Sequence, residues 1–375
     1  MKIAYLHDVI YPHVKGGAEK RVWEISRRLA DRGHEVHIFG MKFWDGESVV
    51  ERNGVFLHGV CDPQDLYVDG RRSIGAAIRF SSKLLLSFRG RFDVIDAQQF
   101  PYLPCYSAKV HSLRRGTPLV ITWHEVWGDY WREYLGKKGL FGMLVERGAL
   151  KLPNMIIPVS ERVRDELLDM GVGAEKMVVV PNGVDLKKID SVKAGEKAYD
   201  VIYVGRLSAH KRVDLLVEAM SLVREEIPDI RCGIVGDGPE LERLVSLSRK
   251  LKLGENVDFL GFLEMEEEVV AKMKSSKIFV LPSTREGFGI SLLEANACGL
   301  PAVVADAPKS AAAGLITEGT NGLLCDLSSR SIASKVVTLL EYDLYKKMSA
   351  PSKEFAKGHD WDEIAKKAEK AYEKL

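Results

Sequence analysis

Lys2-Ile3-Ala4-Tyr5-Leu6, followed after a polar loop by Gly16-Gly17-Ala18-Glu19, is the stretch of sequence that indicates the fold. The first five residues are typical of a buried strand, and the two glycines end the loop that follows it. Apolar residues then recur at helical spacing until Gly33, a helix stop signal; they are Ala18, Val22, Ile25 and Leu29. A strand, a glycine-containing turn and a helix are thus predicted at the start of the chain.

The same alternation of strands and helices continues to the end of the chain. Further strands are predicted at Glu35–Phe39, Val55–His58, Asp93–Ala97, Leu119–Thr122 and Met155–Val159, and then at Asp200–Val204, Arg231–Val235, Val257–Leu260, Ile278–Leu281 and Ala302–Val304. The polar stretch Asp190–Tyr199 separates the two series and is predicted to be a linker. Strands that alternate with helices pair in parallel, so we predict an α/β protein with two Rossmann-like doubly wound parallel-sheet domains.

The composition excludes several classes of protein. The 375 residues are 46% hydrophobic, and 54 Lys and Arg balance 53 Asp and Glu, so no nucleic-acid partner is expected. Five scattered cysteines without a C-x-x-C pair favour a reducing cytoplasm over a disulfide framework or a cysteine-based zinc site. The N-terminal apolar run is too short for a signal peptide, and no uncharged apolar stretch reaches the ~18 residues of a membrane span. We therefore expect a cytoplasmic protein, at most peripheral to a membrane.

Two glycine-containing turns are candidates for binding an anion. Gly16-Gly17 opens a helix whose free N–H groups can face a phosphate, but the G-x-G-x-x-G pattern is missing, which disfavours a dehydrogenase. Val204-Gly205-Arg206-Leu207 lies where the first strand of the second series ends, and Lys211 follows. Two cations at this spacing can clamp a diphosphate, although a solvated charged loop is the ordinary explanation of such a cluster.

The segment Glu286-Gly287-Phe288-Gly289-Ile290-Ser291 opens a helix that carries Glu294. Carboxylates accept strong hydrogen bonds from vicinal hydroxyls, and the N–H groups near Gly289 and Ile290 can face a phosphate. Solvation of a helix surface accounts for one glutamate. It does not readily account for two that bracket a Gly-x-Gly helix start, so we interpret this segment as a sugar-nucleotide site.

Several motifs together resemble a known family. In chain order they are Gly-Gly-Ala-Glu at 16–19, Pro-Asn-Gly-Val-Asp at 181–185, the Gly-Arg-Leu…Lys segment at 205–211, Gly-Asp-Gly-Pro-Glu at 236–240 and the Glu-x7-Glu element at 286–294. This ordered set resembles the GT-B retaining glycosyltransferases of family 4, also called glycosyl transferases group 1. The resemblance implies two Rossmann-like domains facing a cleft. They would be an acceptor-side domain at 1–185 and a nucleotide-sugar domain at 186–355, with a C-terminal helix at 356–375 crossing back to the first domain.

The resemblance also implies roles for individual residues. Arg206 and Lys211 would bind the donor diphosphate, with an N–H group from Gly17. Glu294 would hold the ribose and Glu286 the transferred sugar. The remaining implied contacts are the backbone N–H groups of Gly289 and Ile290, the backbone near Leu263 at the base, and His124 in the active site beside the sugar. The implied catalytic set is His124, Glu286, Arg206 and Lys211, although a hydrogen-bonded histidine at a strand end is an alternative for His124.

Two features bear on donor choice and metal use. Asp306–Ala312 departs from the Gly-Gly-x-x-Glu segment that family members often carry, so donor or acceptor choice cannot be copied from better-known relatives. The literal Asp-x-Asp at Asp360-Trp361-Asp362 starts the last helix, where Asp is a good N-cap, and we interpret it as a cap. No metal site is predicted, because cations and a helix dipole can neutralise the leaving diphosphate.

We therefore expect a metal-independent transferase that moves a sugar from a nucleoside diphosphate to a hydroxyl acceptor. Retention of anomeric configuration is implied by the resemblance alone. No cofactor is expected, because the nucleotide sugar is a co-substrate. Two alternatives stay open: another GT-B activity, such as a sugar phosphorylase or nucleotide-sugar epimerase, and a nucleotide-sugar-binding subunit without catalysis.

A basic helix suggests where the acceptor comes from. Six basic residues and no acidic one lie between Arg71 and Phe92. On a helical projection Arg71, Arg72, Arg79, Lys83 and Arg89 share one side, and Ile74, Ala77, Ile78, Leu84, Leu85 and Phe88 the other. An ordinary surface helix explains this pattern. The alternative is an anionic membrane surface, helped by the aromatic run Trp127, Tyr130, Trp131 and Tyr134, with a lipid-linked acceptor at the inner face of the membrane.

Overall fold

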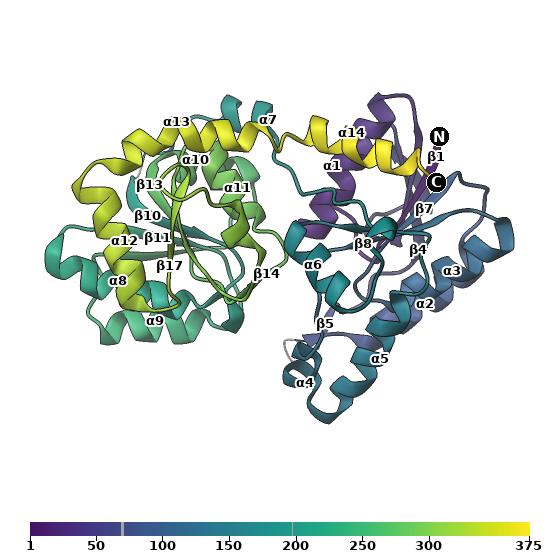
Figure 1. Cartoon of the computed structure of the whole chain (residues 1–375), viewed down its shortest axis with the longest axis horizontal. Helices are drawn as coiled ribbons and strands as arrows, with labels where there is room; N and C mark the ends of the chain where they lie inside the picture. Colours follow the sequence, from purple (N-terminus) through teal and green to yellow (C-terminus); the bar gives the residue numbers. More distant parts are fainter. Residues whose placement is uncertain (69–70, 197) are drawn as a thin grey trace. The chain divides into compact units, whose positions relative to one another are not determined.

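The computed structural model of the chain describes residues 1–68, 71–196 and 198–375 (Figure 1). The chain divides into two units: Met1–Asn182 together with Trp361–Leu375, and Gly183–Asp360. The first part of the first unit thus ends at Asn182, whereas the sequence-based division places this boundary at residue 185. The chain returns to the first unit at Trp361, whereas the sequence-based division begins the returning helix at residue 356.

The first unit is built on a mostly parallel sheet. Its strands, in the order β3-β4-β2-β1-β7-β8-β9, are Val49–Arg52, Val55–Cys61, Glu35–Met41, Lys2–Leu6, Val94–Gln98, Leu119–Trp123 and Met155–Pro158. All neighbours are parallel except β3 and β4. Every strand predicted in this half of the chain is present, which confirms the doubly wound sheet.

Helices cover this sheet, and the first of them follows the predicted pattern. α1 (Gly17–Asp31) buries Val22, Ile25 and Leu29, and Gly33 after it has a φ of 88°, which favours glycine. The other elements of the unit are β5 (Tyr67–Val68), β6 (Arg71–Arg72), α2 (Ile74–Ser87), α3 (Leu103–Arg115), α4 (Tyr130–Leu135), α5 (Gly139–Ala149), α6 (Glu161–Asp169) and α14 (Trp361–Tyr372).

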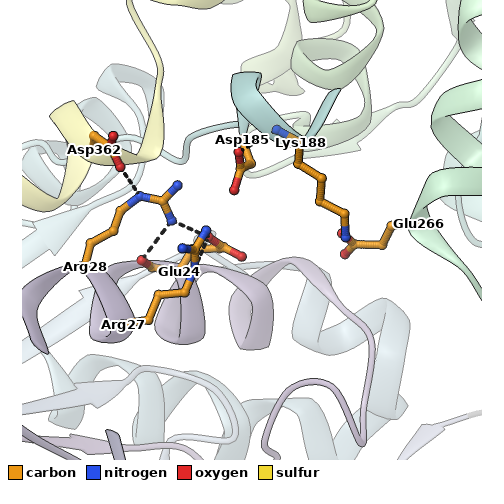
Figure 2. Close-up of polar contacts among 7 residues, drawn as sticks. All are labelled: Glu24, Arg27, Arg28, Asp185, Lys188, Glu266 and Asp362. Carbon is orange, nitrogen blue, oxygen red and sulfur yellow. Dashed lines mark hydrogen bonds and ion pairs between the residues drawn. The ribbon is translucent and has the colours of Figure 1, made fainter. Parts of the chain in front are cut away.

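The last helix completes the core of the first unit. α14 packs on α1, and Ile364, Ala368 and Tyr372 are buried on one face of it, as their spacing predicts. Ion pairs hold it there. Arg28 on α1 contacts both Glu24 and Asp362, with 2.5 Å between Arg28 Nε and Asp362 Oδ1 (Figure 2). Asp362 of the literal Asp-x-Asp therefore binds an arginine of the neighbouring helix.

The second unit has a fully parallel sheet in the order β12-β11-β10-β13-β15-β17. These strands are Val257–Gly261, Cys232–Val235, Tyr199–Val204, Ser276–Leu281, Ala302–Ala305 and Gly322–Cys325. The two-residue strands β14 (Arg285–Glu286) and β16 (Lys309–Ser310) pair beside it. Its helices are α7 (Leu186–Ser191), α8 (Val213–Glu226), α9 (Leu241–Lys250), α10 (Glu266–Lys274), α11 (Ile290–Ala297), α12 (Ser329–Glu341) and α13 (Leu344–Lys357).

The stretch Asp190–Tyr199, predicted as a linker, lies inside the second unit. Its residue 197 is outside the described residues. Lys274 Nζ donates to the Val192 carbonyl (2.7 Å), and the Gly195 N–H donates to the carbonyl of Ala271 (3.0 Å). Just before it, Lys188 on α7 pairs with Glu266 at 2.8 Å. These contacts attach the segment to α10, so it is not the boundary between the units.

Candidate active site

The candidate residues of the first unit follow the carboxyl ends of its central strands, where doubly wound sheets bind ligands. Gly17 is the first residue of α1, and Gly16 before it is extended and has no side chain to cap the helix. The first N–H groups of α1 thus lack a side-chain cap at this position. A Cβ on Gly16 would come within 2.4 Å of Glu19 Oε2, so a larger residue would displace that carboxylate.

His124 directly follows β8 and is held by two glutamines from the end of β7. Its Nε2 lies 2.8 Å from Gln98 Oε1, and its backbone N–H donates to Gln99 Oε1 at 2.9 Å. Burial and, secondly, the charge of Arg21 lower the pKa of His124 well below its usual value. The imidazole is therefore neutral at neutral pH and can donate one hydrogen bond and accept another.

In the second unit, Lys211 lies against Glu286. The loop after β10 carries Arg206, which is exposed, and ends in a 3-10 turn, Ala209–Lys211. Lys211 Nζ lies 2.6 Å from Glu286 Oε1, and both side chains are mostly buried. The structure thus brings together one implied phosphate ligand and one implied sugar ligand.

Two glycines of the segment Gly236-Asp237-Gly238 fix the loop that carries Arg206. Gly236 has a φ of 135°, and a Cβ there would lie 2.0 Å from the Gly205 carbonyl oxygen. A Cβ on Gly238 would lie 2.3 Å from the Leu207 carbonyl oxygen, and the Leu207 N–H donates to the Asp237 carbonyl at 2.8 Å. Only glycine permits this close approach of two backbones, which gives the Gly-Asp-Gly motif a structural role.

The helix start after Glu286 also depends on glycine. Gly289 is the N-cap residue of α11 with a φ of 105°, and Ile290 is the first residue of the helix. Phe288 is buried, which anchors the turn. Glu294 lies four residues into the helix and is partly exposed, whereas Leu292 and Leu293 are buried. Glu294 is therefore on the side of α11 away from the core.

The departing segment Asp306–Ala312 lies directly beside these residues. Glu286 pairs with Ser310 in the parallel register of β14 and β16. A Cβ on Gly289 would lie 3.1 Å from the Cβ of Ala312. The part of the chain that differs from the family pattern therefore adjoins Glu286, the implied sugar-binding residue. Leu263 lies two residues after β12, which ends at Gly261.

The basic helix differs from its prediction. Ser73 caps α2 by accepting a hydrogen bond from the Ala76 N–H, so Arg71 and Arg72 precede the helix and form β6. Arg72 pairs with the buried Asp8 at 2.6 Å and is not part of a basic helix face. The predicted apolar side is also wrong in part, since Ile74 and Ile78 are 57% and 52% exposed.

The two tryptophans of the aromatic run are in the core, whereas Tyr130 and Tyr134 are partly exposed, so the membrane alternative does not hold for Trp127 and Trp131. Trp127 and Trp131 are buried around the carboxylate of Glu146, which is itself fully buried. Glu146 accepts hydrogen bonds from the Trp127 N–H (2.9 Å), Trp131 Nε1 (3.0 Å) and Tyr102 Oη (2.7 Å). Trp127 and Trp131 are thus hydrogen-bonded parts of the core, because a buried carboxylate requires several donors.

The sequence analysis missed Gln98 and Asp96, which adjoin His124. Both lie on β7, two residues apart, and are buried polar side chains. The available signal was a pair of polar residues at alternate positions near the carboxyl end of a strand. Within residues 1–68, 71–196 and 198–375, no cluster of three or more His, Cys, Asp or Glu side chains has the arrangement of a metal site. Over the same residues, no helix is both long and apolar enough to cross a bilayer.

Comparison with known proteins identifies the family. The model of Glycosyltransferase Family 4 matches residues 15–188, and that of Glycosyl transferases group 1 matches residues 185–368. The chain therefore belongs to the group 1, family 4 glycosyltransferases, and its fold is the GT-B fold.

Individual proteins resemble the chain over nearly its whole length. The phosphatidylinositol N-acetylglucosaminyltransferase gpi3 subunit of Schizosaccharomyces pombe is 24% identical, over 98% of this chain and 79% of that protein. The N-acetyl-alpha-D-glucosaminyl L-malate synthase of Bacillus anthracis is 25% identical, over 92% and 90%. The structure of Anabaena HepE in complex with UDP and glucose matches with a TM-score of 0.76 at 22% identity. The match covers 100% of this chain and 100% of that chain.

Proposed function

We propose that the protein transfers a sugar from a nucleoside-diphosphate sugar to a hydroxyl acceptor, with retention of anomeric configuration and without a metal ion. The observation that carries this proposal is the Lys211–Glu286 pair next to the start of α11. A cation for a phosphate, a carboxylate for sugar hydroxyls and a helix N-terminus are thus gathered in one small region.

The chemistry follows from charges that develop at the leaving group. When the bond between the sugar and the diphosphate breaks, negative charge accumulates on the diphosphate. Lys211 and Arg206 would stabilise that charge, with N–H groups of Gly289 and Ile290 at the start of α11. Glu286 and Glu294 would hold the sugar and ribose hydroxyls, and His124, being neutral, would contact the substrate by hydrogen bonds. Positioning and leaving-group stabilisation would supply the catalysis.

We propose a uridine nucleotide as the first donor to test. HepE, which has the same fold, binds UDP and glucose, and the names of the two relatives specify N-acetylglucosaminyl transfer or an N-acetylglucosaminyl product. A thermal-shift panel of UDP-, GDP- and ADP-sugars tests this. A true donor at 100 times its dissociation constant would add about 2.7 kcal/mol to the free energy of unfolding.

Product analysis with the donor found in this way separates the alternatives. A labelled sugar transferred to a hydroxyl acceptor supports the proposal. Release of sugar phosphate with phosphate as co-substrate would indicate a phosphorylase, and an epimerised nucleotide sugar would indicate an epimerase. Binding of the donor with neither transfer nor hydrolysis would indicate a subunit without catalysis.

We further propose a lipid-linked acceptor at an anionic membrane surface on the cytoplasmic side. The S. pombe relative is named for phosphatidylinositol. In this chain, α2 exposes Arg79 and Lys83 beside Ile78, and Arg71 and Arg89 at either end of the helix are exposed too. A surface that combines basic side chains with exposed apolar ones is suited to an anionic bilayer.

α5 contributes a stronger apolar surface than the one predicted from sequence. Phe141 and Leu144 are 70% and 68% exposed, and Leu140 is exposed with them. Lys137 and Lys138 directly precede the helix, and Arg147 lies near its end; all three are exposed. α3 packs against both α2 and α5. We propose that α2 and α5, rather than the aromatic run, form the surface that binds the membrane.

A further inference from the structure

Buried hydrogen bonds join His124 to the last helix of the first unit. Tyr372 Oη on α14 donates to Asp96 Oδ2 at 2.7 Å. Gln98 Nε2 donates to Asp96 Oδ1 at 3.2 Å, and Gln98 Oε1 lies 2.8 Å from His124 Nε2. Asp96 and Gln98 are only 1% and 2% exposed, so solvent does not compete for these bonds.

The surroundings of Asp96 suit its ionised form. Besides Tyr372 and Gln98, Thr122 Oγ1 donates to both carboxylate oxygens, at 2.9 and 3.0 Å. Burial raises the pKa of Asp96 to about 6, and the hydrogen bonds and the charge of Arg21 on α1 oppose that rise. The carboxyl group is therefore mostly ionised at neutral pH. The other titratable groups facing it are Tyr5 on β1 and Cys105 on α3.

An ionised carboxylate only accepts hydrogen bonds, which fixes the orientation of the Gln98 amide. Its NH2 group must face Asp96, and its oxygen must face His124. An amide oxygen also only accepts, so the Nε2 of His124 must carry a proton. Because the imidazole is neutral, Nδ1 then has no proton.

We propose that Asp96 and Gln98 are positioning residues that hold His124 in the Nε2–H tautomer, so that Nδ1 accepts a hydrogen bond from a substrate hydroxyl. The substrate part of this inference rests on the proposed function. The tautomer itself does not, because it follows from the hydrogen bonds within the first unit. The carboxylate of Asp96 thus fixes the orientation of the Gln98 amide, and the Gln98 amide fixes the tautomer of the His124 imidazole.

Asp96→Asn is the decisive variant. It has the same size, but its NH2 group can donate to the Gln98 oxygen, and a reversed Gln98 amide then donates to His124 Nε2. That arrangement favours the Nδ1–H tautomer. Tyr372→Phe is the matched control, because it removes one donor to Asp96 and keeps the carboxylate that orients Gln98.

The test is ¹⁵N NMR of histidine-labelled protein at pH 8, without substrate, with the His124 signals assigned from a His124→Asn variant. We expect protonated Nε2 in the wild type and in Tyr372→Phe. In folded Asp96→Asn we expect at least half of His124 to become Nδ1–H. An Nδ1–H wild type, or an Asp96→Asn spectrum like that of the control, would overturn the proposal.

Two further measurements complete the experiment. If Asp96→Asn does not fold by circular dichroism, Gln98→Met replaces it. A rise in the Nδ1–H population toward that of a free neutral imidazole supports the proposal, and a tautomer population equal to that of the wild type overturns it. With an active donor, folded Asp96→Asn should lower kcat at least tenfold and leave the donor KM within about twofold. Because the NMR result needs no substrate, an error in the proposed function leaves the tautomer assignment intact.

Discussion

Lys211 Nζ and Glu286 Oε1 lie 2.6 Å apart, although 75 residues separate them in the chain. Each partly buried charge is compensated by the other. The lysine comes from the turn before α8 and the glutamate from the short strand before α11. This pair therefore links the implied phosphate and sugar contacts, and a change in one partner will alter the electrostatics of the other.

Lys211→Ala should lower turnover at saturating donor by about 100-fold or more, comparable with the loss of one preorganised electrostatic donor. Arg206→Ala should behave in the same way. Lys188→Ala is the control, because Lys188 also pairs with a glutamate of the second unit at 2.8 Å but is not an implied donor ligand. Steady-state kinetics checks this, and near-normal turnover in both site variants would exclude the role in leaving-group stabilisation.

Activity should persist without an added divalent metal. In the proposed function, Arg206 and Lys211 would take the role that a metal has in other transferases, and Asp362 is bound by Arg28. The measurement is initial rate after dialysis against EDTA, with and without magnesium or manganese. Loss of activity in EDTA that either metal restores would contradict the prediction.

Gly236→Ala should displace the loop that carries Arg206, because its Cβ would lie 2.0 Å from the Gly205 carbonyl oxygen at a φ of 135°. We expect a loss of about 1–3 kcal/mol in the free energy of unfolding, together with a raised donor KM. Gly254→Ala, in the same unit, is the control, since a Cβ there would meet nothing within 4 Å. Chemical denaturation and donor titration check both variants. Equal effects of the two variants on stability and donor KM would show that the close backbone approach at Gly236 does not matter for either.

The buried Asp96 should make stability depend on pH. Its pKa of about 6 in the folded protein exceeds the ordinary aspartate pKa of 3.8, so the folded state binds the proton more tightly than the unfolded state. Its contribution to the free energy of unfolding therefore rises as the pH falls from 7 to 5, by about 1 kcal/mol. The measurement is the difference in unfolding free energy between the wild type and Asp96→Asn at several pH values. A difference that stays constant or shrinks toward pH 5 would be incompatible with a raised pKa.

Binding of the protein to membranes through α2 and α5 should require both basic and apolar side chains. Phe141→Ser with Leu144→Ser should weaken binding to anionic phospholipid vesicles at least tenfold, because two exposed apolar side chains would no longer enter the bilayer. Arg79→Glu with Lys83→Glu should abolish the preference for anionic over neutral vesicles. Tyr342→Ser, which changes an exposed aromatic residue of the second unit, is the control. Co-sedimentation at low salt decides, and unaltered binding by both double variants would exclude this surface.

The sequence was sufficient to predict the two sheets, because buried parallel strands are apolar runs such as Ile278–Leu281 that alternate with helices. The strands that were missed are of other kinds, and one of them, β3, is an antiparallel strand at the edge of the first sheet. β17 (Gly322–Cys325) contains no β-branched residue, and β14 is two residues long and pairs with a strand that is equally short. Such strands form because they pair with a neighbouring strand, and the local sequence pattern does not indicate them.

The motifs of the candidate site were accessible from the sequence, but the partners of individual side chains were not. The aromatic run that contains Trp131 suggests a membrane surface as one alternative, whereas Glu146, fifteen residues later, accepts a hydrogen bond from the Trp131 indole in the core. Arg72 was placed on a helix face although Ser73, a good N-cap residue, directly follows it. Asp8 then pairs with that arginine from 64 residues away, a contact that no spacing rule contains.

The burial of α14 in the core of the first unit has a consequence for biosynthesis. Trp361, Ile364 and Tyr372 pack with Ile3, Tyr5 and other residues of the first strands, so this core contains side chains from both extremes of the numbering. On the ribosome, the second unit is complete before these residues emerge. The domain translated first is thus finished last, and until then its apolar surface under α14 is uncovered. A chaperone that shields nascent chains would find its substrate in the first unit, and delays in translating the last helix would prolong that exposure.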